Sequence, residues 1–224
     1  MFIKPKIFTD KNILSGFSFN TEKYETQEEF ENALIGPKNK KMIFLNQKHT
    51  DKTALIPGSN ISDPHDAAIT QRKGYFLFLR TADCNPILFY EPQKKVIGAV
   101  HAGWRGLKSE IFTKTINLAV KKYHIDTALI KVSVGPSIRS CCYEVKDDLI
   151  KEFQNFEKLD TLFVKRGGKI HFNQTERLKN EILSLGIKEE NIEIIDQCTH
   201  CSEKFFSYRE NKTELRNLAF IAIT

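Results

Sequence analysis

The sequence predicts an α+β (mixed α/β) fold, and two features of its apolar pattern support this class. First, the apolar runs "PILFY" and "KVIGAVHAG" follow each other closely, with only the Pro-led turn "EPQKK" between them. Second, apolar residues recur at helical spacing from Leu107 to Tyr123. Because strands joined by short turns pair antiparallel, the pattern argues against a purely parallel, doubly wound sheet.

Strand-like segments occur along most of the chain. The segment 74–80 is apolar throughout, which is typical of a strand buried on both faces. A β-hairpin is predicted over 161–172, with Gly167 and Gly168 in its turn. The other expected strands are 41–45, 54–60 (ending in a turn), 86–90, 95–103, 128–136, 191–196 and 218–224.

Several helices are expected, and the one at 173–186 has clear end signals. Asn173 is an N-cap residue, Glu176 stands three positions later as in a capping box, and Gly186 stops the helix. The others are a short acidic helix at 27–35, a helix at 107–123 and one at about 147–159.

The composition restricts the partners. Of the 224 residues, 41% are hydrophobic and 28% are charged, which is an ordinary globular balance. The net charge of +6 suits anionic ligands such as phosphate, but no basic run interleaved with aromatic residues indicates a nucleic-acid partner. No apolar run reaches the roughly 18 residues of a membrane span, so no membrane association is expected.

The cysteines and the amino-terminal segment indicate a cellular compartment. The first residues, "MFIKPKIFTDKN", lack the apolar core of a signal peptide, and five is an odd number of cysteines. We therefore expect a cytoplasmic protein in a reducing environment. There, cysteines serve as metal ligands, nucleophiles or core residues more often than in disulfides.

Three side chains stand where catalytic groups usually sit. His49, Cys84 and His101 each follow or end an apolar strand, and each is flanked by small or polar residues. One cysteine and two histidines form a set that suits catalytic zinc, which commonly takes three protein ligands and keeps one position open. Their spacing along the chain matches no compact zinc motif, so packing remains the alternative.

A second group of cysteines is ambiguous. Cys198 and Cys201 form a C-x-x-C pair around His200, a pattern of zinc sites and of thiol redox chemistry. A structural zinc site needs a second pair of ligands, and the adjacent Cys141 and Cys142 are a poor geometry for one metal. We therefore interpret these cysteines as core or pocket packing.

Five motifs, taken together and in chain order, resemble those of the YfiH-like family. Its members were once named multicopper polyphenol oxidases or laccases and are now described as zinc-dependent purine nucleoside phosphorylases with adenosine deaminase activity. The resemblance runs from about Met42 to the last residue, and "TADC" with "HAGWRG" is its most specific part. The motifs are "QKH" (Gln47–His49), "TADCNP" (Thr81–Pro86), "HAGWRG" (His101–Gly106), "GPSIRSCCYEV" (Gly135–Val145) and "CTHCSEKFFSYRE" (Cys198–Glu210).

The resemblance implies a single domain over 1–224, in which a layered sandwich of mixed β-sheets is flanked by helices. It implies a Zn²⁺ cofactor, in preference to copper, held by His49, Cys84 and His101, which also count as catalytic. The implied partners are phosphate and purine nucleosides: adenosine, inosine, guanosine and methylthioadenosine. Gln47 of the first motif joins the substrate-binding residues, and we expect a monomer or a weak homodimer.

The chain departs from the family pattern at three places. The stretch "GFSFNTEKYET" lacks an arginine and some glycines that the family usually has there. Asn173 stands where an aspartate is usual, and Glu210 replaces the second arginine of "SYRR". These changes affect the expected substrate preference and phosphate contacts.

Phosphorolysis of a nucleoside passes through an oxocarbenium-like state, so an anionic phosphate must be held near ribose C1′. Arg105 and Arg209 are the arginines expected to hold it, with a surface ion pair as the alternative for Arg105. Trp104 either stacks on the ligand or anchors the core. Ser207 and Tyr208 either donate hydrogen bonds to substrate or simply belong to a loop.

Deamination needs a hydroxide delivered to purine C6, and zinc supplies one by lowering the pKa of a bound water to about 7. A nearby carboxylate should carry the protons, as in other zinc deaminases. Asp83 and Glu144 are the candidates. Asp83 adjoins Cys84 and could instead orient a ligand histidine, and the residues alone leave both roles open.

Three other functions are compatible with these residues. A cysteine hydrolase acting on an amide, such as a cell-wall precursor, would use Cys84 as nucleophile and His101 as base and would not need His49. A copper-dependent phenol oxidase would need more histidines than the six present, and type 1 copper also takes a weak axial ligand such as methionine. A zinc-binding regulator without catalysis is the third.

Overall fold

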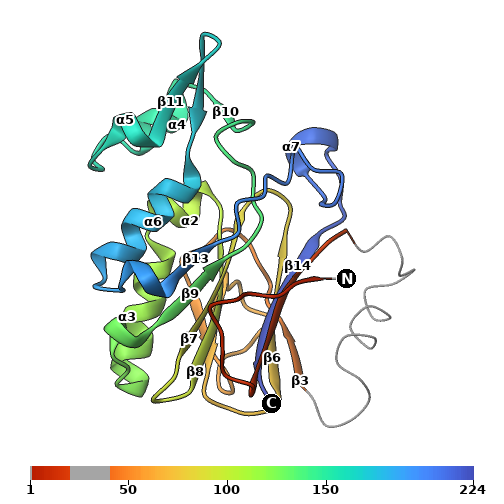
Figure 1. Cartoon of the computed structure of the whole chain (residues 1–224), viewed down its shortest axis with the longest axis vertical. Helices are drawn as coiled ribbons and strands as arrows, with labels where there is room; N and C mark the ends of the chain where they lie inside the picture. Colours follow the sequence, from red (N-terminus) through yellow and green to blue (C-terminus); the bar gives the residue numbers. More distant parts are fainter. Residues whose placement is uncertain (1, 21–40) are drawn as a thin grey trace.

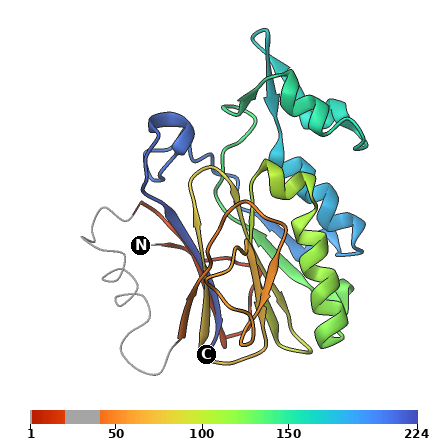
Figure 2. The same cartoon turned by 180° about the vertical axis from the view of Figure 1, so that it is seen from behind.

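A computed structural model describes residues 2–20 and 41–224 and arranges them in layers. Helices α3 (Ile111–Tyr123) and α6 (Gln174–Ser184) cover one face of a six-stranded sheet, and a five-stranded sheet lies on its other side (Figures 1 and 2). The predicted mixed class and layered sandwich with flanking helices are confirmed. The helix expected at 27–35 lies outside the described residues.

The six-stranded sheet is mixed. Its central strands β7 and β8 pair antiparallel, whereas β4 pairs parallel with β5 and β13 parallel with β9. The order across the sheet is β13-β9-β7-β8-β5-β4. The bounds are β4 Thr53–Leu55, β5 Ala67–Thr70, β7 Asn85–Glu91, β8 Val96–Ala102, β9 Lys131–Val134 and β13 Ile192–Ile194.

The five-stranded sheet has the order β1-β2-β14-β6-β3. Strand β6 lies between β14, which is antiparallel to it, and β3, which is parallel. The sequence predicted β3, β6 and β14 but not β1, β2 or β5, because those three segments are short or carry polar residues. The bounds are β1 Phe2–Ile3, β2 Ile13–Ser18, β3 Lys41–Phe44, β6 Tyr75–Thr81 and β14 Asn217–Ile223.

Strand alternation divides the core into separate layers. In β7, Ile87 and Phe89 belong to the cluster beneath the helices, whereas Leu88 and Tyr90 belong to the cluster between the two sheets. Strand β6 divides in the same way, because Leu77 faces the other sheet and its neighbours join an outer cluster. Full burial of such a side chain contributes roughly 1.5–3 kcal/mol. Burial on both faces explains why these strands read as unbroken apolar runs.

The helix predicted over 107–123 is interrupted. It consists of α2 (Trp104–Lys108) and α3, separated by Glu110 in the left-handed region with φ 56°. Leu107 and Ile111 keep helical spacing across the break, so periodicity alone could not detect it. The helix predicted at 147–159 is also shorter: α4 (Asp147–Glu152) and α5 (Leu159–Leu162) are separate.

A small third sheet packs beside α4 and α5, at the top of Figure 1. It contains the predicted hairpin, in which Gly167 and Gly168 both have positive φ, as a two-residue I′ turn requires. The predicted cap of α6 is confirmed, since the Asn173 side chain accepts a 3.2 Å hydrogen bond from the Glu176 N–H. The remaining elements are β10 Glu144–Val145, β11 Phe163–Arg166, β12 Lys169–Phe172, α7 Tyr208–Asn211 and the short 3₁₀ helices Thr127–Leu129 and Glu189–Asn191.

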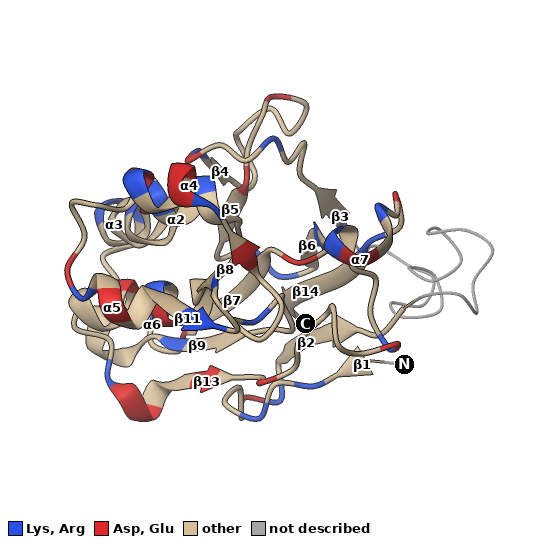
Figure 3. Cartoon of the chain, turned by 90° about the horizontal axis from the view of Figure 1, so that it is seen from above, with Lys and Arg blue, Asp and Glu red and all other residues tan. Residues whose placement is uncertain are grey.

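Charged residues of both signs are interspersed over the elements in the view from above (Figure 3). Within the described part of the chain, no helix combines the length and the apolar character that crossing a bilayer would require.

The close approach of β7 to β8 leads to a stability prediction. Gly98 pairs with Phe89, and a methyl group added at Gly98 would overlap the fully buried Phe89 ring. We expect Gly98→Ala to lower the free energy of unfolding by about 1–3 kcal/mol, measured by urea denaturation. Gln93→Ala, in the exposed turn between the same strands, should stay within about 0.5 kcal/mol of the parent; equal stability of the two variants would contradict the packing argument.

Candidate active site

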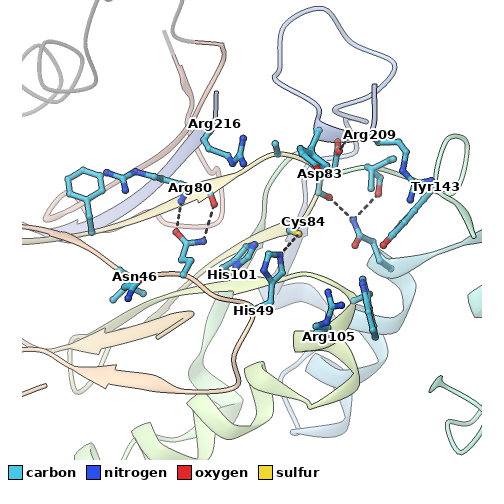
Figure 4. Close-up of a pocket in the computed structure, with 18 of the residues that line it drawn as sticks. Asn46, His49, Arg80, Asp83, Cys84, His101, Arg105, Tyr143, Arg209 and Arg216 are labelled. Carbon is cyan, nitrogen blue, oxygen red and sulfur yellow. Dashed lines mark hydrogen bonds between the residues drawn. The ribbon is translucent and has the colours of Figure 1, made fainter. Parts of the chain in front are cut away.

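The three predicted ligands reach the same end of the two large sheets (Figure 4). His49 follows β3, His101 lies in β8, and Cys84 lies on the turn from β6 to β7. Because β6 and β7 belong to different sheets, that turn crosses from one layer to the next. The structure therefore brings together side chains that are far apart in sequence: one ligand atom from each of the three lies within 4.8 Å of the others.

The geometry of this trio leaves room for one ion. The Cys84 Sγ is 3.8 Å from the His49 Nε2, and the two imidazole rings are 5.0 Å apart between centroids. The backbone of Gly103 closes the group from one side. A Cβ at that position would come within 2.8 Å of the Cys84 Sγ and 3.1 Å of the His49 Cδ2. A glycine is therefore required beside the trio.

A buried carboxylate that sequence reasoning missed holds the trio in place. Asp66, just before β5, accepts hydrogen bonds from the backbone N–H groups of Lys48, His49 and Thr50, at 2.6–3.1 Å, and from the Thr50 hydroxyl. Its Oδ1 is also 2.7 Å from the Nδ1 of His101. Asp66 thus shapes the His49 loop and turns the other ring nitrogen of His101 toward the site. An acid directly before the short strand β5 was the only signal available in the sequence.

The same contacts set the protonation states. Burial raises the pKa of Cys84, but the charge of His101 and hydrogen bonds with His101 and His49 outweigh it and lower the pKa overall. Burial lowers the pKa of His101, but Cys84 and Asp66 together raise it. Burial likewise opposes ionisation of Asp66, yet its hydrogen-bond donors hold its pKa at about 2. Cys84 is therefore prone to be a thiolate, the form that binds metals or attacks electrophiles.

The donor set fits a metal ion. Two imidazole nitrogens and one thiolate are the kind of ligands that zinc takes in catalytic sites, where a fourth position stays open. All three side chains line a cavity of about 900 Å³, so an open position would face that cavity. An orienting carboxylate such as Asp66 on a ligand histidine is a common feature of such sites.

Arginine side chains surround the cavity and make it positive. The sequence singled out Arg105 and Arg209 as phosphate ligands, and both line the cavity. Arg80 and Arg216 also line it, and sequence reasoning missed them because they lie on other strands or loops. Arg105 forms no ion pair with the described residues; its guanidinium lies 4.3 Å from the Trp104 ring centroid. Such a cavity favours an anionic ligand.

Aromatic side chains form part of the same wall. Trp104 lines the cavity and also packs against the core beneath the helices, so both of its expected roles are compatible with its position. Tyr143 contacts Phe172 and lies under the Arg209 guanidinium, 5.0 Å from ring centroid to Cζ. Tyr208 is 47% exposed at the cavity edge.

Two predicted residues line the cavity but use their polar atoms in the framework. The Gln47 amide exchanges two 2.9 Å hydrogen bonds with the backbone of Arg80. The Asp83 carboxylate accepts from the Thr199 hydroxyl at 2.7 Å and from the Arg209 N–H at 2.6 Å. Asp83 therefore fixes the loop that carries Arg209. None of its recorded hydrogen bonds reaches a histidine of the trio.

Two predicted residues lie outside the cavity. Ser207 is fully buried and caps α7 by accepting a 3.2 Å hydrogen bond from the Glu210 N–H, so it does not reach a substrate there. Glu144 pairs with Lys169 at 2.7 Å on β10 and lines a smaller neighbouring hollow. The structure thus does not bring Glu144 to the trio, because β10 belongs to the third sheet.

The role of Asp66 can be tested through metal affinity. Asp66→Asn keeps the shape of the side chain but removes the charge that favours a ring proton on the Nδ1 of His101. We expect a loss of about 10- to 100-fold in zinc affinity, measured by competition with a chromogenic chelator. Asp63→Asn, on the exposed loop just before it, is the matched control and should bind zinc like the parent. Unchanged affinity in Asp66→Asn would show that the carboxylate does not orient a ligand.

Known proteins similar in sequence to this chain include purine nucleoside phosphorylases. A purine nucleoside phosphorylase of Aquifex aeolicus (strain VF5) is 39% identical over 186 residues, covering 82% of this chain and 84% of the relative. A purine nucleoside phosphorylase of Clostridium acetobutylicum is 31% identical over 213 residues, covering 92% and 87%.

Solved structures share the fold. YlmD from Geobacillus stearothermophilus superposes with a TM-score of 0.85 at 23% identity, covering 98% of this chain and 94% of that one. The hypothetical protein YfiH of Bacillus licheniformis gives 0.84 at 24% identity, covering 95% and 93%.

A family model covers nearly all of the chain. The model described as multi-copper polyphenol oxidoreductase laccase matches residues 18–224, which include all five of the motifs quoted from the sequence. The resemblance drawn from those motifs is confirmed, and the chain belongs to this multi-copper polyphenol oxidoreductase laccase family, whose structural neighbours include YfiH and YlmD.

Proposed function

We propose that the chain is a zinc-dependent purine nucleoside phosphorylase that also deaminates adenosine and cleaves methylthioadenosine. The observation that carries this proposal is the His49–Cys84–His101 trio on the wall of an arginine-lined cavity. Relatives named purine nucleoside phosphorylase support an enzyme with nucleoside and phosphate as substrates. A cavity of about 900 Å³ is large enough for both. The cytoplasmic location stays a prediction.

The arginines suit the phosphate. In phosphorolysis a phosphate oxygen forms a bond to ribose C1′ while the bond from C1′ to purine N9 breaks, and the purine leaves with a proton. Arg105 and Arg209, with Arg80 and Arg216 nearby, can hold the phosphate by charge-assisted hydrogen bonds. The same positive field does not stabilise an oxocarbenium-like ribose, so the phosphate must lie between the arginines and C1′.

The aromatic wall suits the purine. Trp104 and Tyr143 line the cavity with aromatic rings that can pack against a flat base, and an arginine guanidinium lies over one face of each ring. Burial, together with the charge of Cys84, raises the pKa of Tyr143 to about 12. Its phenol therefore stays protonated at neutral pH and can donate a hydrogen bond to the base or the ribose.

Deamination requires water and a proton carrier. Zinc bound by the trio would serve as a Lewis acid that activates water for attack at purine C6, where the C–N bond to the amino group breaks and ammonia leaves. Asp66 holds His101 for that role by its 2.7 Å contact. Asp83 is the one carboxylate among the described residues that line the cavity, so it is the candidate for moving the proton in addition to accepting the framework hydrogen bonds from Thr199 and Arg209. Glu144 is not used, because it lies in the neighbouring hollow.

The central experiment combines metal analysis with product detection. Purified protein given inosine or adenosine with phosphate should release the free base and ribose 1-phosphate, and adenosine without phosphate should yield inosine. Cys84→Ala should lose both the trio's zinc and turnover, because it removes the thiolate ligand. Full activity in Cys84→Ala would contradict the site assignment. If the parent protein binds zinc tightly but turns over no nucleoside, a zinc-binding regulator is favoured instead.

The phosphate role of the arginines has its own test. Removing Arg105 deletes a charge-assisted contact of about 1.5–3 kcal/mol, so Arg105→Ala should lower kcat/KM for phosphate by about 10- to 100-fold. Steady-state kinetics with phosphate as the varied substrate measures this effect. Arg166→Ala, an exposed arginine on β11, is the control and should leave kcat/KM unchanged. An equal loss in both variants would point to net charge rather than to a specific contact.

A cysteine hydrolase is the second candidate, and one observation favours it. Asp66 orients His101, which in turn promotes the Cys84 thiolate, as a nucleophile, base and orienting acid would be arranged. A chelator separates the two functions, since a hydrolase would keep its activity after metal removal. Loss of phosphorolysis on chelation, with recovery on adding zinc, supports the phosphorylase.

The family description names copper, so the ligands of the trio must be compared with those that copper sites use. Type 1 copper uses two histidines, a cysteine and a weak axial ligand such as methionine. No methionine occurs among the described residues that line the cavity. Metal analysis of the same preparation distinguishes zinc from copper directly.

A further inference from the structure

We propose that Cys141, Cys142, Cys198 and Cys201 form a second metal centre, a closed zinc site that joins two loops of the cavity wall. One sulfur from each of the four cysteines lies within 4.8 Å of the other three. Cys198 and Cys201 therefore have the second pair of ligands that a structural zinc site needs, which was not expected from the sequence. The adjacent Cys141 and Cys142 supply it, contrary to the expectation that neighbouring cysteines suit one metal poorly.

The sulfur positions fit a shared cation better than a disulfide. The Cys201 Sγ is 3.5 Å from the Cys141 Sγ and 3.1 Å from the Cys142 Sγ, and one sulfur can form only one disulfide bond. A tetrahedral zinc with Zn–S bonds of about 2.3 Å places its four sulfurs roughly 3.8 Å apart. The distances of 3.1 and 3.5 Å are somewhat shorter than that value and no sulfur pair exceeds 4.8 Å, so a small outward movement of the Cys201 side chain would seat the ion.

The backbone brings the two pairs together from distant parts of the chain. A tight turn holds Cys141 and Cys142, because the N–H groups of Cys142 and Tyr143 both donate to the Arg139 carbonyl at 2.9 Å. Cys198 forms an isolated parallel bridge with Ser137, which aligns the second loop beside the first. The site is therefore built by backbone hydrogen bonds that do not depend on the thiols.

Contacts around the four sulfurs also favour thiolates that bind a metal. The Arg139 N–H donates to the Cys198 Sγ at 3.4 Å, the type of N–H to sulfur bond that supports metal-bound thiolates. Zinc with four thiolates carries a net double negative charge, which needs a nearby cation. The buried Arg139 side chain, whose Nε lies 3.7 Å from Asp196, supplies one beside this loop.

A site with four sulfur ligands has no open position, so its role is structural rather than catalytic. It would join the loop that ends at Tyr143 to the loop that leads to Arg209. Both residues line the cavity. Thr199, between the two ligands of the second loop, also donates to Asp83 beside Cys84. The closed site would thus stiffen the wall against which substrate binds, without taking part in the reaction.

Metal counting tests this proposal separately from the proposed function. Protein saturated with zinc under reducing conditions and then desalted should hold two zinc ions per chain by mass spectrometry of the metals. Cys84→Ser should hold one, Cys201→Ser should hold one, and the double variant should hold none. Cobalt in place of zinc in Cys84→Ser should give the intense absorption bands of tetrahedral thiolate coordination, and the double variant Cys84→Ser/Cys201→Ser should lose them.

The proposal would be overturned by the absence of zinc from Cys84→Ser, in which only the four-cysteine site remains, or by unchanged zinc content in Cys201→Ser compared with the parent. A disulfide joining two of the four cysteines in the freshly reduced, zinc-saturated protein would also overturn it. If Cys201→Ser fails to fold, the zinc content of Cys142→Ser and the cobalt spectrum of Cys84→Ser test the same site. The metal count does not depend on phosphorolysis. A protein without phosphorylase activity would therefore still test the four-cysteine site through its zinc content.

Discussion

The buried carboxylate of Asp66 is the contact on which the site depends. An ionised carboxylate without exposure to water is tolerated only when hydrogen bonds surround it, and here five donors do so. The donors come from the loop after β3 and from His101 in β8. The same bonds hold His49 in the left-handed region, at φ 57°. One charge thus joins a loop of one sheet to a strand of the other.

The layered architecture explains why chemistry collects at this end of the molecule. Strands β6 and β7 are buried on both faces, so they are rigid supports, and the turn between them carries Asp83 and Cys84 across from one sheet to the other. Helix α2 begins directly after Gly103 and presents Trp104 and Arg105 to the same space. Rigid strand ends with short loops hold reacting groups more accurately than long loops do.

The two cysteine-containing groups are connected through the wall they share. Thr199, inside the C-x-x-C loop, donates to Asp83, and Asp83 precedes Cys84 of the trio. Asp83 also accepts the Arg209 N–H, which places an arginine over the cavity. Order in the cysteine loop is thereby transmitted to the residues that face substrate, by direct hydrogen bonds rather than through the core.

The sequence by itself determined the features that depend on neighbours along the chain. These are the apolar strands, the hairpin turn at Gly167 and Gly168, the Asn173 cap and the placement of each trio member at the end of a strand. Only the tertiary structure decided which strand ends meet, because sheet order depends on packing between distant segments. For that reason Asp66, Arg80 and the pairing of the four cysteines could not be read from local patterns. The break at Glu110 was hidden for another reason: a single left-handed residue leaves the apolar spacing of a helix intact.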